Sequence, residues 1–113
     1  MLPRIGRLRK EHDHELVRRV GRRTSDQFLT VKTLQTGKTL TRVAVVVSKR
    51  VDKRATVRNR IKRQVRGMIE GVYQKLKPGI DVVIIVNPAA LNISRKDTET
   101  RLIYLLNKQA IIK

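Results

Sequence analysis

The chain has 113 residues and carries 27 Lys and Arg against 9 Asp and Glu, which gives a formal net charge of +18. Its length predicts one domain over residues 1–113, and its apolar content of 40% suits a packed core rather than a disordered basic tail. The absence of cysteine excludes a disulfide scaffold, a thiolate zinc site and a cysteine nucleophile.

The charge favours a polyanionic partner, because so basic a domain repels itself unless nucleic acid or an anionic membrane offsets the charge. No apolar run reaches the roughly 18 residues that span a bilayer. The start Met1-Leu2-Pro3-Arg4 has no apolar signal segment, so we expect a cytoplasmic protein with no membrane partner. A nucleic-acid-binding domain is the leading hypothesis, and a merely basic protein without such a partner is the plainest alternative.

The first elements expected along the chain are a basic arm and a short helix. Residues 1–10 are predicted to form a flexible arm. Asp13 is suited to cap a helix that runs to about Val20, where Gly21 ends it. Residues 22–25 fit either a short edge strand or a loop. The apolar positions expected on the helix are Leu16, Val17 and Val20.

Two strands are expected next. Residues 27–34 are rich in Thr and Val, and residues 42–48 contain the β-branched run Val43-Ala44-Val45-Val46-Val47, which predicts a central buried strand. The intervening Gln35-Thr36-Gly37-Lys38 predicts a turn. We therefore expect the two strands to pair as an antiparallel hairpin.

The clearest periodicity begins at Val57 and runs to about Leu76, before Pro78-Gly79. At 100° per residue its apolar side chains fall within an arc of about 120°. These apolar residues are Val57, Ile61, Val65, Met68, Ile69, Val72 and Leu76, and the basic residues on the opposite side are Arg60, Lys62, Arg63 and Arg66. The apolar side is interpreted as core, because strands elsewhere in the chain supply apolar surface for it.

The rest of the chain adds one strand and one helix. Residues 80–86 are almost wholly apolar, which predicts an interior strand. Ser94 and Asp97 have the spacing of a capping box and start a final helix. The order helix, strands, helix, strand, helix is most economically an α+β fold with helices packed on a single sheet.

The basic cluster between Lys49 and Arg66 is the strongest functional signal, with nine basic residues and one acid, Asp52. A strand end, a basic loop and a helix amino end meet here, and free N–H groups together with Arg side chains suit phosphate. Arg58 and Lys62 share a helix side, which makes them candidates to clamp neighbouring phosphates. A solvated helix face is the ordinary alternative.

No protein catalytic centre is recognisable in the sequence. His12 and His14, two residues apart on a helix, do not face one metal site, and there is no P-loop or Ser-His-Asp pattern. The carboxylates are too few and scattered for a nuclease metal site made by protein alone. The aromatics are limited to Phe28, Tyr73 and Tyr104, so binding should depend on phosphate and shape rather than on base stacking.

The run Arg58-Asn59-Arg60-Ile61-Lys62-Arg63, preceded by Ser48-Lys49-Arg50 and Lys53-Arg54-Ala55, closely resembles the signature of the bacterial ribonuclease P protein component. The resemblance extends over nearly the whole chain, from Leu2-Pro3 to the strand ending at Val86. It implies an αβββαβα sandwich with the topology of the second domain of ribosomal protein S5. That topology includes a left-handed βαβ crossover, whereas base rates alone favour a right-handed one.

The resemblance also implies a function, namely the protein subunit of a ribonucleoprotein endonuclease that removes the 5′ leader from precursor tRNA. The RNA subunit would catalyse cleavage and hold most of the Mg²⁺, while the protein would bind the RNA subunit and the leader and raise Mg²⁺ affinity. The protein would then contribute no catalytic or metal-binding residue of its own. The residues expected to meet the catalytic RNA are Lys49, Arg50, Lys53, Arg54, Arg58, Asn59, Arg60, Lys62, Arg63 and Arg66.

The second surface implied by the resemblance is a cleft between the first helix and the sheet, which takes the leader. His14 and Arg18 stand where the family's helix usually carries aromatics, and Val31 takes the place of a strand aromatic. By strand parity, Phe28 should face the other side of the sheet from Val31. We therefore assign His14, Arg18 and Val31 to leader binding and expect that contact to be more electrostatic than is usual in the family.

Two other classes of protein remain open at this point. A ribosomal protein or RNA chaperone without a catalytic role would co-sediment with ribosomal subunits. A DNA-compacting protein would prefer duplex DNA to folded RNA. The net charge fits all three classes, and only Arg58-Asn59-Arg60 in its setting separates them within the sequence.

Overall fold

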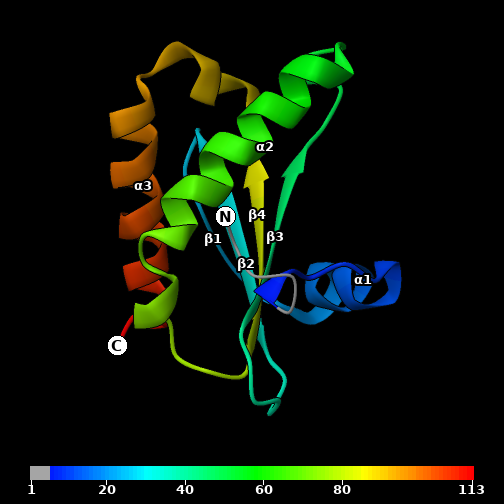
Figure 1. Ribbon diagram of the computed structural model, residues 1–113, viewed down its shortest axis with the longest axis vertical. Coiled ribbons are helices and arrows are strands. Elements are labelled where there is room, and N and C mark those ends of the chain that lie inside the picture. The colour runs from blue at the N-terminus through cyan, green and yellow to red at the C-terminus, as the bar shows by residue number, and fades with distance from the viewer. Residues whose placement is uncertain (1–5) are drawn as a thin grey trace.

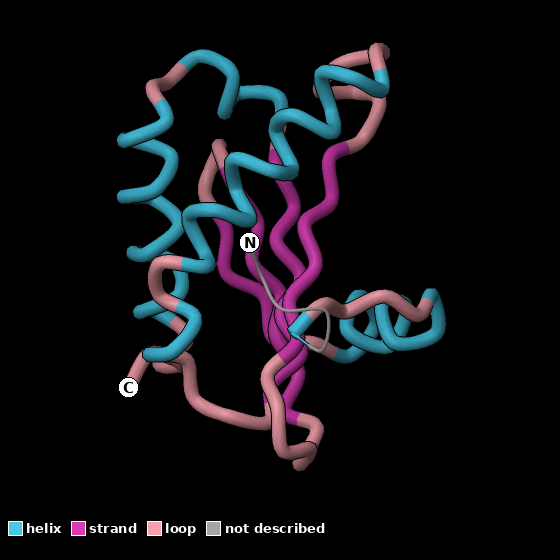
Figure 2. Tube along the Cα trace, viewed as in Figure 1, coloured by secondary structure: helices cyan, strands magenta, loops and turns pink. Residues whose placement is uncertain are grey.

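The computed structural model describes residues 6–113. Three helices surround a four-stranded sheet in the predicted αβββαβα order (Figure 1). The helices and strands are α1 (Glu11–Val20), β1 (Arg22–Ser25), β2 (Leu29–Gln35), β3 (Arg42–Val47), α2 (Ala55–Glu70), β4 (Ile80–Val86) and α3 (Arg95–Lys108). Two short 3₁₀ helices, η2 (Tyr73–Lys75) and η3 (Pro88–Asn92), flank β4 in the chain, and Figure 2 shows the loops that join these elements. Within residues 6–113, no helix is long and apolar enough to cross a membrane.

The strand order across the sheet is β1-β2-β4-β3. β2 is antiparallel to both β1 and β4, and β3 is parallel to β4. The hairpin expected between residues 27–34 and 42–48 is therefore wrong, because β4 lies between the two strands. β4 is buried at all positions but one, on both faces, so an interior place in the sheet stabilises it more than an edge would. Residues 22–25 form the edge strand β1 rather than a loop.

The link between β2 and β3 passes around the start of β4. The N–H of Thr36 donates to the carbonyl of Gly79 at 2.8 Å, and the hydroxyl of Thr41 accepts a hydrogen bond from the N–H of Ile80 at 3.2 Å. Gly79 has φ of +75°, and a Cβ there would lie 2.7 Å from the carbonyl oxygen of Lys38, so a residue with a side chain is excluded by both conformation and contact. The predicted turn at residues 35–38 is therefore part of a connection that passes β4, and it does not close a hairpin between β2 and β3.

β3, α2 and β4 form a βαβ unit whose strands are parallel neighbours. In Figure 1 both strands point upward and α2 crosses in front of them, with β4 to the left of β3. The crossover is therefore left-handed, which is rare among such units. This confirms the left-handed crossover that the family resemblance implied, although most βαβ units are right-handed.

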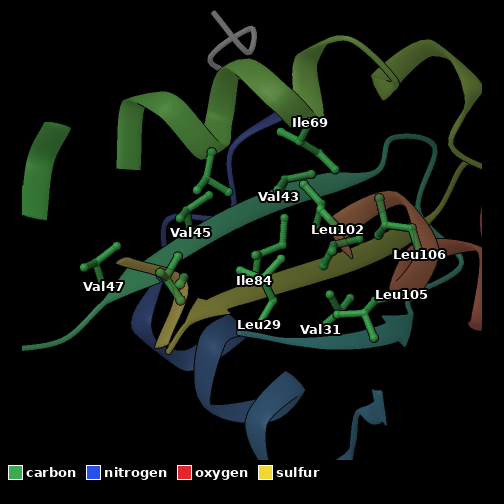
Figure 3. Packing of buried hydrophobic residues seen from close by; sticks show 14 of the residues in the cluster. Leu29, Val31, Val43, Val45, Val47, Ile69, Ile84, Leu102, Leu105 and Leu106 are labelled. Carbon is green, nitrogen blue, oxygen red and sulfur yellow. The ribbon is translucent and has the colours of Figure 1, made fainter. Parts of the chain in front are cut away.

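The sheet is covered on both faces. The larger core lies between the sheet and the pair α2 and α3, and Figure 3 shows strand valines meeting Ile69 of α2 and Leu102, Leu105 and Leu106 of α3. The smaller core lies under α1 and consists of Leu8, Val17, Ala44 and Val83. Because successive strand residues point to opposite faces, the adjacent Val82 and Val83 belong to different cores.

The first helix differs from its expected form. It begins two residues before Asp13, at Glu11, and Lys10 precedes it without a side-chain cap. Of its three expected apolar positions only Val17 is buried, and Val20 is 55% exposed. Asp13 instead forms an ion pair with Arg42, at 3.2 Å. The ion pair joins α1 to β3, in addition to the packing of Val17 in the smaller core.

Part of the arm expected over residues 1–10 is packed. Residues 1–5 lie outside the described residues, but Leu8 is buried in the smaller core and its N–H donates to the carbonyl of Val43 at 2.9 Å. The flexible-arm interpretation is therefore wrong for residues 6–8.

The two later helices follow their sequence patterns more closely. α2 ends at Glu70, earlier than the expected limit near Leu76, and the chain continues through η2, although Leu76 is buried as predicted. The predicted cap of α3 is confirmed, since the Ser94 hydroxyl accepts from the N–H of Asp97 at 3.1 Å.

Candidate nucleic-acid interface

The loop between β3 and α2 is organised by one acid, Asp52. One carboxylate oxygen of Asp52 accepts from the backbone N–H of Arg54 at 2.8 Å, and both of its oxygens accept from the Arg54 guanidinium at 3.1 Å. The hydrogen bond from the Arg54 side chain holds the pKa of Asp52 below its ordinary value and raises the pKa of Arg54. Each group thus stabilises the charged form of the other, and the pair fixes the turn that leads into the helix.

Arg58 ties the loop to the first turn of α2. Its Nη1 donates to the carbonyls of Asp52 and Lys53, at 3.1 and 2.7 Å. The side chain is half-buried, unlike the exposed Arg60 two residues later. One nitrogen of Arg58 is thus engaged with the backbone, and the hypothesis that Arg58 and Lys62 clamp neighbouring phosphates stays a prediction.

The other cations of this surface are exposed, except Lys62 and Arg66, which are half-buried. Within residues 6–113, no hydrogen bond or ion pair is formed by the side chains of Lys49, Arg50, Lys53, Arg60, Lys62, Arg63 and Arg66. The structure brings these residues, Arg54, Arg58 and Asn59 together on one loop and one helix, as predicted. We call these ten residues, the seven cations together with Arg54, Arg58 and Asn59, the basic face. Unpaired cations at this density suit a polyanion, since binding releases counterions from its phosphates.

Helical geometry divides the basic face into two flanks. At 100° per residue, side chains four apart lie on the same side of a helix. Arg58, Lys62 and Arg66 therefore follow one flank of α2, Arg60 and Gln64 follow the flank toward α3, and Arg63 lies between the two flanks.

A groove of about 270 Å³ lies between α1 and the sheet, where the family resemblance placed leader binding. His14 and Arg18 line it as predicted. The Nε2 atom of His14 lies 2.8 Å from the carbonyl oxygen of Leu8, which holds the ring beside the chain segment before α1. The other lining residues are Glu11, Glu15, Lys32, Val46, Val83 and Ile85.

Val31 does not reach this groove. It is fully buried in the larger core, on the opposite face of the sheet, and Figure 3 shows it beside Leu105 of α3. Its assignment to leader binding is therefore wrong. Phe28 packs against the same core as Val31, so the parity argument also fails, because Phe28 precedes the first residue of β2, Leu29.

Lys32 takes the place that was assigned to Val31. The alternation of β2 places Val31 toward the core and Lys32 toward the groove, where its Nζ donates to the carbonyl of Arg18 at 3.4 Å. Glu15 accepts two hydrogen bonds of 2.6 Å from Arg18, which lower its pKa. Glu11 and Glu15 offset the charges of Arg18 and Lys32, so the groove is less basic than these two cations alone would make it.

The carboxylates do not form a metal site by themselves. No group of three or more His, Asp or Glu side chains within the described part of the chain is placed to hold a metal ion. Asp52, the acid of the basic face, is committed to Arg54. The arrangement of charges fits phosphate better than it fits a protein-bound cation.

Comparison with known proteins agrees with this geometry. A family model described as Ribonuclease P matches residues 2–110. The ribonuclease P protein component of a Cyanothece species is 32% identical, covering 99% of this chain and 98% of its own. The ribonuclease P protein component of a Synechocystis species is 36% identical, and the match covers 98% of this chain and 90% of the Synechocystis protein.

Solved structures share the fold. The RNase P protein of Staphylococcus aureus matches with a TM-score of 0.86 at 20% identity, over 96% of this chain and 98% of its own. The RNase P protein of Thermotoga maritima matches with a TM-score of 0.79 at 24% identity, and the match covers 90% of this chain and 96% of the Thermotoga protein. This chain belongs to the ribonuclease P protein family.

Proposed function

We propose that this ribonuclease P protein subunit binds the catalytic RNA through the basic face. The observation that carries the proposal is a set of Lys and Arg side chains around Arg58-Asn59-Arg60 that have no partner among residues 6–113. They lie on a loop and helix that internal hydrogen bonds hold in place. Because these hydrogen bonds hold the loop and the start of the helix, less backbone entropy is lost on binding. Each phosphate that it neutralises releases counterions, so affinity depends steeply on salt.

The groove beside α1 is the surface proposed to bind the 5′ leader of precursor tRNA. His14, Arg18 and Lys32 lie on its walls, and Val46, Val83 and Ile85 form its apolar part. An extended single strand has an apolar base face and an anionic backbone, and a groove with both kinds of lining matches that chemistry. The pairing of Arg18 with Glu15 limits the positive charge there, so leader contact is expected to add to the binding by the basic face rather than dominate it.

Catalysis is proposed to belong to the RNA subunit. The described carboxylates gather into no metal-binding group, so Mg²⁺ is expected to be held mainly by RNA phosphates. The protein would assist endonucleolytic removal of the leader by positioning the RNA chains and by favouring Mg²⁺ binding, and it would act in the cytoplasm, where precursor tRNA is made.

Reconstitution tests the proposal. The purified chain is added to its cognate RNA subunit and precursor tRNA at low Mg²⁺, and appearance of the free 5′ leader is followed. Cleavage should rise on addition of the protein, and the protein alone should cleave nothing. No stimulation, or cleavage by the protein alone, would contradict the proposal.

A matched pair of charge variants locates the effect. Arg60→Ala with Arg63→Ala removes two charges from the basic face, whereas Lys108→Ala with Lys113→Ala removes two charges from exposed positions elsewhere. The first pair should weaken RNA binding more strongly and lower its salt slope by about 0.7–0.9 for each phosphate that is no longer neutralised. Equal weakening by the two pairs would indicate attraction by net charge alone.

A further inference from the structure

A second groove lies between α2 and α3, and we call it the interhelix groove. It consists of an inner hollow of about 310 Å³ and an outer hollow of about 620 Å³. Gln64, Met68 and Arg95 line both hollows, so the two are continuous. Its lining residues come from α2, the end of β4, the η3 segment and the start of α3. The inner volume lies within the range of roughly 300–1,000 Å³ that is usual for pockets holding small organic groups.

The two hollows differ in chemistry. The inner hollow is mainly apolar and includes Leu91, a large hydrophobic side chain that is 51% exposed, with Val86, Ala90 and Ile93 around it. The outer hollow has three cations, Arg63, Arg95 and Lys96, and one acid, Glu99. An apolar hollow continuous with a cationic one matches a ligand that has a flat apolar part and an attached anion.

The polar groups of the interhelix groove are free to bind such a ligand. Gln64 is half-buried where the hollows join, and its amide offers two donors and an acceptor. Among residues 6–113, the side chains of Gln64, Arg60, Arg95 and Lys96 make no hydrogen bond or ion pair. Arg60 belongs to the flank of the basic face nearest α3, so this groove continues the surface proposed to bind the catalytic RNA.

We propose that the interhelix groove holds one unpaired nucleotide of the catalytic RNA. The base occupies the inner hollow beside Gln64, where apolar side chains and the guanidinium planes of Arg60 and Arg95 provide the stacking that aromatics supply elsewhere. Its phosphates lie in the outer hollow, on Arg63, Arg95 and Lys96. The proposal rests on the binding of catalytic RNA by the basic face, and it extends that site to α3.

The phosphate part of the proposal is tested at Gly67, which lines the outer hollow. A Cβ at Gly67 would meet nothing within 4 Å, and most residues favour a helix interior more than glycine does, so Gly67→Glu and Gly67→Gln should both fold. The two variants differ only in charge. Gly67→Glu should bind the catalytic RNA about tenfold more weakly than Gly67→Gln, and equal affinities would overturn the placing of phosphate in this hollow.

The salt slope gives a second measurement of the phosphate contacts. Arg95→Ala should lower the slope of log affinity against log salt by about 0.7, the value for one single-strand phosphate. Lys108→Ala, which removes a charge from the far end of the same helix, is the control and should leave the slope unchanged. A slope that is equal in Arg95→Ala and the wild type would also overturn the proposal.

The base part is tested at Gln64 by chemical probing of RNA in the complex at saturating protein. One unpaired nucleotide of the catalytic RNA should be protected at its base edge by the wild type and become reactive again with Gln64→Leu, while other protections remain. If the wild type binds but no nucleotide responds, the groove assignment fails and the proposed function stands. If the wild type does not bind the catalytic RNA, both fail. A responding nucleotide in precursor tRNA would overturn the choice of RNA.

Discussion

Two arginines of one motif have different structural roles. Arg58 donates to two loop carbonyls, whereas Arg60 is exposed and forms no hydrogen bond or ion pair with the described residues. The motif therefore combines a residue that shapes the binding surface with one that is free to bind. A charge count treats the two as equivalent, but their substitution should affect different measurements.

Arg58→Ala should lower the free energy of unfolding by about 1 kcal/mol, because two hydrogen bonds to the loop are removed. Arg60→Ala should change it by less than about 0.5 kcal/mol, as is usual for exposed residues, and still weaken binding of catalytic RNA. Urea denaturation and RNA binding over a salt series separate the two effects. Similar decreases of stability in both variants would contradict the distinction.

The Asp26 carboxylate should give stability a dependence on pH. It accepts from the N–H groups of Phe28 and Leu29, at 2.8 and 2.9 Å, and from the Arg101 guanidinium at 2.7 Å. Burial raises the pKa of Asp26, but the N–H of Leu29, the Arg101 guanidinium and the N–H of Phe28 together outweigh burial and hold the pKa below its ordinary value. Asp26 therefore joins the turn before β2 to α3 most strongly when it is ionised.

Because the folded pKa is lower than the unfolded one, this contribution is complete above the ordinary Asp pKa of about 3.9 and is lost as pH falls through the folded value. Asp26→Asn should be less stable than the wild type by about 1–2 kcal/mol at neutral pH. The difference should shrink as the pH of urea denaturation is lowered below about 4. If the stability difference between Asp26→Asn and the wild type does not change with pH, the negative charge of Asp26 does not contribute to stability.

At the scale of elements, α1 is attached to the sheet by one buried side chain, Val17, and by an ion pair. Arg42 of β3 donates to both carboxylate oxygens of Asp81 on β4, at 2.9 and 2.7 Å, and to Asp13 of α1 at 3.2 Å. The Asp81 carboxylate, through its hydrogen bonds, raises the pKa of Arg42. Together with the buried Val17, this ion cluster joins α1, one wall of the groove beside α1, to the sheet.

Arg42→Met should lower the free energy of unfolding by about 2–4 kcal/mol, because the Asp81 side chain, only 4% exposed, loses its counterion. Pairing Arg42→Met with Asp81→Leu should recover most of this stability, since no buried charge remains unpaired. Asp13→Asn should change stability less but weaken leader binding. Denaturation of the three variants measures the first effects, and a leader-length series of precursor tRNA measures the last.

At the scale of the whole molecule, we expect repulsion between cations to outweigh the described ion pairs. The chain has three times as many basic as acidic residues. Raising NaCl from about 0.02 M to about 0.2 M shortens the Debye length to less than about 10 Å, so it should increase the free energy of unfolding while weakening RNA binding. Opposite responses of folding and binding are the expected result. A fall in stability with salt would show that the ion pairs dominate instead.

Features encoded within a short stretch of chain could be predicted from the sequence. The apolar stripe of α2, the interior strand β4 and the cap at Ser94 follow from periodicity, apolar content and local spacing, and the structure confirms them. The motif Arg58-Asn59-Arg60 was likewise sufficient to indicate the family. The physical reason is that helix faces, burial tendencies and caps depend on residues only a few positions apart.

The pairing of distant segments was decided by the tertiary structure. The insertion of β4 between β2 and β3, the burial of Val31 and the position of Lys32 in the groove beside α1 depend on strand order and register, which local patterns do not specify. The interhelix groove likewise joins Arg60 to Arg95 through packing of α2 and α3. Residue types alone show which side chains are suited to bind polyanions. Which of them share a surface depends on the folded chain, because contacts between distant residues form only when the whole sheet is assembled.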